Sequence, residues 1–204
     1  NYLEKENPQA IIFDLMFIKS MRTAPEADKA LADAMNKYPN VYTAMNLDNQ
    51  TSDVRIPADL PERISVNLEN NSNIDLTKKY GYKNCRLILD SLLNGKANVG
   101  MSNVFRNSDG IIRNVAPLMV YKDKYYPYLA FKASSDYLAQ KPNKDFVIDR
   151  NKNLKVFDTT IPLTQDGEAI LNWYGTSGTH TIVPMYKVIN EMEGKTGTVA
   201  QKFD

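Results

Sequence analysis

The hydrophobic pattern of the first fifty residues predicts a strand, a helix and a second strand. Residues 10–18 are apolar on both faces, which is typical of a central strand covered on each side. Thr23 to Glu26 form a Thr-x-x-Glu capping box, and apolar residues at helical spacing follow as far as Tyr38. Residues 40–47 alternate as a second strand. If the two strands are parallel, their helical connection should be right-handed.

The next segment, residues 48–83, is polar and rich in Asn, Asp and Pro. Only Ile64, Val66 and Leu68 alternate in it, so we expect a long surface excursion with one short edge strand. Helical spacing returns from Cys85 to Leu92, and Gly95 is placed to end that helix. The role of this excursion stays open at the level of sequence.

Two turn signals predict β-hairpins in the second half of the chain. Asp109-Gly110 lies between two apolar runs within residues 98–119, and Gln165-Asp166-Gly167 lies between two more. Helices are expected from Pro127 and from Pro184, the latter with its apolar face inward. Together the elements predict a single mixed α/β (α+β) domain over residues 1–204, with a central mixed sheet, helices packed on it and two hairpins.

Arg113 is the residue of this pattern that most invites a functional interpretation. Counting by twos from Ile111 places it on the same face as the apolar residues that follow, so its guanidinium should enter the interior or line a pocket. A buried charge needs a carboxylate or an anionic ligand. The candidate partners are Asp14, at the end of the first predicted strand, and Asp109. The set of Asp14, Arg113 and Asp109 is either a structural salt bridge or the polar anchor of a ligand pocket.

Composition removes several classes of function. The formal charge is +1, with 25 basic and 24 acidic residues spread along the chain, so we expect no nucleic-acid partner. One cysteine, Cys85, and one histidine, His180, argue against a disulfide, a zinc site or any other bound metal. No Gly-rich phosphate loop is present, and no cofactor is expected. No apolar run approaches the length of about 20 residues that a membrane span requires.

The sequence contains only one weak candidate for a catalytic pair, Ser177 and His180. Ser177 lies three residues before His180, but the order Gly-Thr-Ser-Gly differs from the Gly-x-Ser-x-Gly of a nucleophile elbow. A flexible loop with an exposed histidine explains the same residues. We predict no catalytic residue and keep a serine hydrolase using Ser177 and His180 as a remote alternative.

The order of the motifs along the chain points further. The series consists of Ala10-Ile-Ile-Phe-Asp14-Leu-Met-Phe17, Glu26-Ala-Asp-Lys-Ala-Leu31, Asn98-Val-Gly100 leading to Asp109-Gly-Ile-Ile-Arg113, Tyr126-Pro-Tyr-Leu-Ala130, Ile161-Pro-Leu163 with Asp166-Gly167, and Ile170-Leu-Asn-Trp-Tyr-Gly175. This series resembles a CHASE domain of the second type over nearly the whole chain. Each motif is modest, and specificity comes from their order.

The resemblance implies an extracytoplasmic sensory domain, periplasmic or at the cell surface, trimmed at both ends from a bacterial membrane receptor. Flanking transmembrane helices would anchor it, and the parent receptor would be a homodimer. Its output would be a cytoplasmic adenylate or guanylate cyclase, a histidine kinase, a cyclic-di-nucleotide enzyme or a Ser/Thr kinase. The signal would be an unknown small molecule or a physical stimulus. An extracellular binding or adhesion domain without signalling output is the alternative.

Overall fold

The computed structural model describes residues 3–20, 23–49, 59–176 and 178–195. Contacts divide the chain into two compact units, a large unit of residues 9–171 and a terminal unit of residues 1–8 and 172–204. The large unit combines helices with parallel and antiparallel strands, so the predicted mixed α/β class is confirmed. A single domain over the whole chain stays a prediction.

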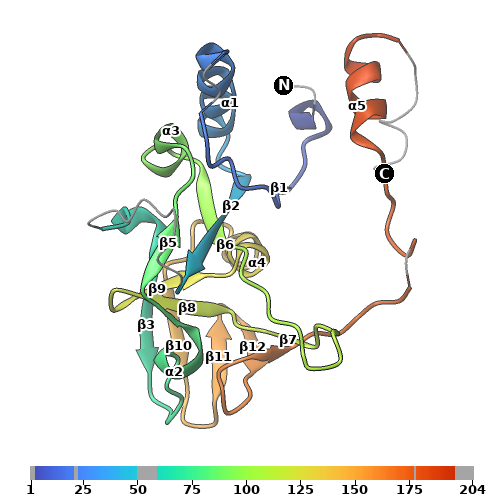
Figure 1. The fold of residues 1–204 in the computed structure, drawn as a ribbon. Helices are drawn as coiled ribbons and strands as arrows, with labels where there is room; N and C mark the ends of the chain where they lie inside the picture. Colours follow the sequence, from blue (N-terminus) through green and yellow to red (C-terminus); the bar gives the residue numbers. More distant parts are fainter. Residues whose placement is uncertain (1–2, 21–22, 50–58, 177, 196–204) are drawn as a thin grey trace. The chain divides into compact units, whose positions relative to one another are not determined.

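The first sheet is built on the predicted strand, helix and strand (Figure 1). Strand β1 (Ile11–Phe13) pairs in parallel with β2 (Val41–Asp48), and α1 (Pro25–Lys37) connects them. Strand β2 also pairs in parallel with β6 (Asn98–Met101), while its last residues pair in antiparallel fashion with β5 (Asn84–Arg86). The sheet is therefore mixed, with β2 bonded on both sides.

The strand covered on both faces is β2, and the prediction of residues 10–18 as a central strand is wrong. Only β1 forms from that segment, at the edge of the sheet, with Ile12 46% exposed. The chain leaves the sheet after Phe13, and Phe17 reaches the main core from an irregular segment. Alternate residues of β2 face opposite sides: Val41 and Met45 lie in the main core, and Tyr42 and Ala44 pack toward α4.

Helix α1 forms where the spacing predicts it, but the predicted capping box is absent. Ala24 is the N-cap, and no side chain caps the helix. Pro25 occupies the first turn, where its missing N–H costs nothing, and the N–H of Ala27 bonds the carbonyl of Ala24 at 3.0 Å. Ala32 and Met35 anchor the helix in the main core.

A second sheet has the order β12-β11-β10-β3. Strand β3 (Asn67–Asn70) lies at its edge, as predicted for the polar excursion, and pairs in parallel with β10 (Asp145–Ile148). Two hairpins join β10, β11 (Asn153–Val156) and β12 (Thr159–Pro162).

A three-stranded sheet pairs β4 (Gly81–Tyr82) with β8 (Leu118–Tyr121) and β8 with β9 (Lys124–Pro127). Pro127 ends β9 and does not begin a helix, contrary to expectation. Helix α4 (Leu129–Ala139) starts two residues later. Its approach to β6 is close, because a Cβ at Gly100 would lie 2.5 Å from the Cα of Leu129.

The Asp109-Gly110 turn forms, but the strands on either side of it do not pair with each other. Gly110 has a φ of +80°, and its N–H bonds the carbonyl of Asn107 at 2.8 Å. Strand β6 before the turn pairs with β2, and β7 (Asn114–Val115) after it pairs with β13 (Ala169–Ile170). The hairpin predicted here is therefore wrong.

The second predicted reversal is confirmed. The N–H of Thr164 bonds the carbonyl of Glu168 at 2.8 Å, and Leu163 and Ala169 form an antiparallel bridge around the turn. Gly167 has a φ of +79°, which suits the glycine of this turn.

The helix predicted from Cys85 to Leu92 is mostly wrong. Cys85 lies on β5, fully buried, and only α3 (Asp90–Leu93) is helical. The remaining short elements of the large unit are η2 (Glu62–Ile64) and α2 (Thr77–Tyr80).

The terminal unit contains η1 (Leu3–Glu6) and α5 (Met185–Met192). Helix α5 follows Pro184 as predicted, but of its expected inward residues only Val188 is buried, while Met185, Ile189 and Met192 are exposed. Within the described part of the chain, no helix has the length and hydrophobicity to cross a bilayer.

Candidate functional site

Arg113 lies at the surface, not in the interior. Its side chain is 47% exposed, because residues 111–113 are not part of a strand and alternation does not apply to them. Its Nη2 lies 2.7 Å from Oδ2 of Asp109, and this partner lowers the pKa of Asp109 to about 2. Asp14 is exposed, and in the described residues no bond joins it to Arg113. The structure thus brings Arg113 to Asp109 and not to Asp14, and a ligand-binding role for the three stays a prediction.

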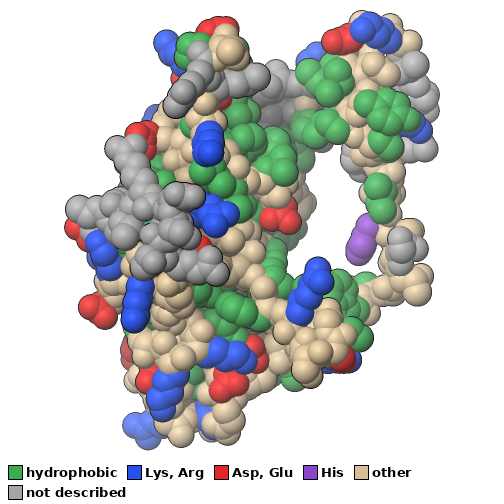
Figure 2. Space-filling model, in the orientation of Figure 1, with side chains coloured by type: hydrophobic (Ala, Val, Ile, Leu, Met, Phe, Trp, Pro, Cys, Tyr) green, Lys and Arg blue, Asp and Glu red, His purple; other side chains and the backbone are tan. Residues whose placement is uncertain are grey.

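The hydrolase alternative gains nothing from the structure. Ser177 lies outside the described residues. His180 is exposed, and Figure 2 shows the histidine, in purple, at the surface. Within the described ranges no hydrogen bond joins His180 to an orienting carboxylate, the third member that such a mechanism needs.

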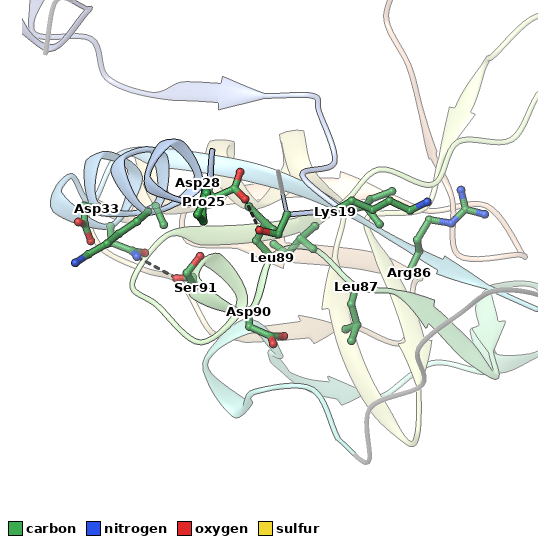
Figure 3. Close-up of a pocket in the computed structure, with 15 residues that line it drawn as sticks. Lys19, Pro25, Asp28, Asp33, Arg86, Leu87, Leu89, Asp90 and Ser91 are labelled. Atoms are coloured by element: carbon green, nitrogen blue, oxygen red, sulfur yellow. Dashed lines mark hydrogen bonds between the residues drawn. The ribbon is translucent and has the colours of Figure 1, made fainter. Parts of the chain in front are cut away.

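A cavity of about 760 Å³ lies in the large unit, beside α1 (Figure 3). We call it the α1 cavity. One wall is α1, a second is the segment Arg86 to Ser91 that joins β5 to α3, and a third is residues 18–20. Apolar residues form its base, with Ala32 and Ile88 each 2% exposed. A cavity of this size suits a small metabolite.

Asn36 fixes the distance between two of these walls. From α1, its Nδ2 donates to the carbonyl of Ser91 at 3.1 Å, and its Oδ1 accepts the N–H groups of Lys96 and Ala97, both at 2.8 Å. A Cβ at Gly95 would lie 2.4 Å from Oδ1 of Asn36, so the contact requires glycine there. These hydrogen bonds therefore attach α1 to the segment on either side of Gly95.

The third wall is attached to the second in a similar way. The N–H of Leu89 donates to the carbonyl of Phe17 at 2.7 Å. Across the cavity, Ser20 Oγ donates to Oδ2 of Asp28 at 2.6 Å, which orients that carboxylate. Figure 3 shows this bond and the Asn36 bond as dashed lines.

A half-buried arginine, Arg63, supports the α3 wall. Its guanidinium donates to the carbonyls of Leu92 (2.8 Å) and Leu93 (2.5 Å), at the carboxyl end of α3, and to that of Ala97 (2.7 Å), just before β6. Burial lowers the pKa of Arg63, and backbone dipoles take the place of a carboxylate partner. The polar context of residues 48–83 gave no signal of this role.

A buried polar cluster lies on α4, and the sequence analysis did not predict it. Lys132 Nζ lies 2.6 and 2.5 Å from the two carboxylate oxygens of Asp136, and both side chains are at most 7% exposed. Asp136 also accepts the Tyr42 hydroxyl at 3.2 Å and the Asn143 N–H at 2.6 Å. Burial and the neighbouring Asp136 raise the pKa of Tyr42. The i,i+4 spacing of Lys132 and Asp136 was the available signal, but it is equally typical of an exposed pair.

Tyr42 and Asp136 also line a smaller cavity of about 500 Å³. The carboxylate of Asp136 already accepts four donor contacts there, from Lys132, Tyr42 and Asn143. It has little remaining capacity for a ligand.

Glu168 is the third buried charge. Its carboxylate accepts the Tyr80 hydroxyl, Lys79 Nζ at 2.9 Å and Asn114 Nδ2 at 3.1 Å. Burial opposes its ionisation, but these three donors prevail and lower its pKa. The cluster fastens the chain beside β13 to α2 and β7, so its role is structural. Among the described residues, no group of three or more His, Cys, Asp or Glu side chains could hold a metal ion.

A family model described as the CHASE2 domain matches residues 1–203. The chain belongs to the CHASE2 family. CHASE2 domains are extracytoplasmic sensory domains, which confirms the resemblance stated from the motifs. No curated protein and no solved structure matches this CHASE2 domain.

Proposed function

We propose that this CHASE2 domain is the signal-input domain of a bacterial transmembrane receptor. It regulates a cytoplasmic output domain, such as an adenylate or guanylate cyclase or a histidine kinase, through membrane-spanning helices that flank it. The observation that carries the proposal is the family match over residues 1–203, because the matched family consists of extracytoplasmic sensory domains. The domain itself contributes no catalytic step.

Signalling in this scheme is differential binding. A ligand shifts a receptor between two arrangements only to the extent that it binds one of them more tightly. In the parent homodimer, the two copies of the domain would exchange between two relative arrangements, and the helices entering the membrane would follow.

A ligand in the α1 cavity would contact several elements of the fold at once. One part of its lining comes from residues 18–20 and α1, and the other from residues 86–91, about fifty residues further along the chain. A ligand that touches α1 and Arg86 to Ser91 at once would favour one spacing of these elements. Because α1 connects β1 to β2, a change in that spacing reaches the first sheet directly.

The test is a full-length receptor in membrane vesicles, assayed for output with candidate signals added on the extracytoplasmic side. We expect output to change with a signal, and we expect removal of this domain to abolish the response while basal output remains. A matched control, Lys83→Gln, lies outside the α1 cavity and should leave the response intact. A parent protein without membrane-spanning helices, or a response that survives removal of the domain, would contradict the proposal.

A further inference from the structure

We propose that the loop between β6 and β7, residues 102–113, is the surface through which two copies of this domain pair. We call it the β6–β7 loop. This inference rests on the proposed function, in which the parent receptor is a homodimer, and it names the part of each copy that meets the other. It follows from three features of the loop: an ordered backbone, exposed apolar side chains and an exposed ion pair that can be shared across a two-fold axis.

The β6–β7 loop is ordered by its own hydrogen bonds, although Figure 1 shows it, in yellow-green, projecting from the sheets of the large unit. At its start, the side-chain amide of Asn103 accepts the N–H of Leu47 at 2.9 Å and donates to the carbonyl of Leu47 at 2.7 Å. Near its tip, the N–H of Asn107 donates to the carbonyl of Ile111 at 3.0 Å. A surface that is already held in one shape loses little conformational entropy when a partner binds.

Several apolar side chains of this ordered loop face water. Val104, Phe105 and Ile111 are each between 40% and 50% exposed. Beside the end of the loop, Ile170 is 74% exposed on β13, opposite Asn114, the residue that follows the loop. Exposed apolar side chains on a preformed surface are typical of an interaction site, because a partner removes their area from water.

The charges of the loop favour a second copy of the chain as the partner. The loop contains two arginines and one aspartate, a net charge of +1, so two copies repel each other little. Arg113 and Asp109 form a pair with two contacts, at 2.7 and 3.0 Å, and about half of each side chain is exposed. This pair uses only part of the donor capacity of a guanidinium. Across a two-fold axis, Arg113 of each copy meets Asp109 of the other, so every contact joins opposite charges.

The membrane anchors of the proposed receptor make a weak interface sufficient. Helices in the bilayer would hold the two copies together, which raises the effective concentration of each domain around the other. A short loop with a few apolar side chains buries less area than a permanent interface, so we expect pairing to be weak in solution. Weak pairing suits a sensor, because a signal can then shift the balance between two arrangements.

Sedimentation equilibrium of the chain of residues 1–204, over a range of concentrations, tests the pairing. We expect a dimer whose population rises with concentration. Asp109→Arg makes every charge of the loop positive, and Arg113→Asp makes both members of the shared pair negative. Each variant alone should dimerise at least about tenfold more weakly than the parent chain, because like charges then meet across the axis.

An equimolar mixture of the two variants separates an interface from a structural role. Asp109→Arg and Arg113→Asp each lose the ion pair within the loop, so a purely structural role predicts that mixing restores nothing. If the loop is the interface, the mixture joins a positive loop to a negative one, and the heterodimer should form at least as readily as the parent dimer. A fluorophore on one variant identifies the heterodimer.

One control variant tests whether the charge effect is specific to the loop. Lys155→Glu reverses an exposed charge on β11, outside the loop, and should dimerise as the parent chain does. Near-ultraviolet circular dichroism verifies that each variant is folded, so that a loss of pairing cannot come from unfolding.

Four outcomes would overturn the inference. They are a chain that stays monomeric at every concentration, a dimer that neither charge reversal weakens, a mixture that forms no more dimer than either variant alone, and a monomer that instead binds phosphatidylglycerol vesicles through this loop. The proposed function fails separately. A receptor that responds to its signal through this domain, although the isolated domains do not pair, retains the sensory role, and a dimer in a receptor without any response does the reverse.

Discussion

Two ion pairs in this domain have the same i,i+4 spacing and opposite surroundings. Asp109 and Arg113 lie in a loop with about half of each side chain exposed, and their Nη2 to Oδ2 distance is 2.7 Å. Lys132 and Asp136 lie on α4, with 5% and 7% of their side chains exposed and a distance of 2.5 Å. Geometry alone would rank the two pairs as equals, so burial decides which one the fold depends on.

This difference in burial could not be predicted from the sequence pattern. The apolar neighbours of Arg113 suggested an interior position, but the chain around it is not a strand. Lys132 and Asp136 look like an ordinary solvated pair on a helix, yet α4 packs this side against β2, and Tyr42 bonds Asp136 there. The four predictions below test this contrast.

The largest effect is expected for Lys132→Met. Methionine preserves much of the side-chain volume but leaves the Asp136 carboxylate buried without its cation. Breaking a buried pair from one side costs about 3–5 kcal/mol. Chemical denaturation should show this loss in the free energy of unfolding. A variant as stable as the parent would mean that the Lys132–Asp136 pair does not stabilise the fold.

Glu168→Gln should produce a smaller loss that depends on pH. The donors around Glu168 lower its pKa in the folded state, so its contribution is present above the ordinary carboxyl pKa of about 4.3 and is lost as the pH falls through the folded value. At neutral pH we expect a loss of about 1–3 kcal/mol. Melting temperatures measured from pH 7 downward should converge for variant and parent, and parallel curves would contradict the assignment.

Tyr42→Phe should cost about 0.5–1.5 kcal/mol, because it removes one neutral donor from the Asp136 cluster and keeps the ring. Tyr137→Phe, at an exposed position of α4, is the matched control and should leave the melting temperature unchanged. Equal effects of the two substitutions would show that the buried hydroxyl bond is not a specific contribution.

Arg113→Met should have the smallest effect, with no measurable change in the free energy of unfolding at physiological salt. Exposed pairs gain little because water and ions screen them. The same substitution in the full-length receptor tests the remaining prediction for Asp14, Asp109 and Arg113. A folded variant that no longer responds to the signal would assign that loop a role in ligand binding or in the receptor interface.

The fold class, the first β-α-β unit, the edge strand in the polar excursion and the Gln165 to Gly167 reversal could be predicted from periodicity and turn chemistry. These signals are local. The partners of β6 and β7 could not be predicted, because each strand pairs with one distant in sequence. The role of Arg63 could not be predicted for the same reason, because its three acceptors lie about thirty residues further along the chain.

The candidate site could not be predicted from the sequence, for a related reason. The α1 cavity depends on hydrogen bonds between Asn36 and residues more than fifty positions further along the chain. No sequence pattern near Asn36 predicts these contacts. The motifs did, however, lead to the family, because their order along the chain is a long-range property that any single motif lacks.

Arg63 has one more consequence for a domain that operates outside the cytoplasm, where acidity is poorly buffered. A salt bridge to a carboxylate would loosen once acid protonated its anion. Amide oxygens do not titrate in that range, and a guanidinium keeps its proton. The contacts of Arg63 with the end of α3 should therefore keep their geometry when the acidity of the surroundings changes.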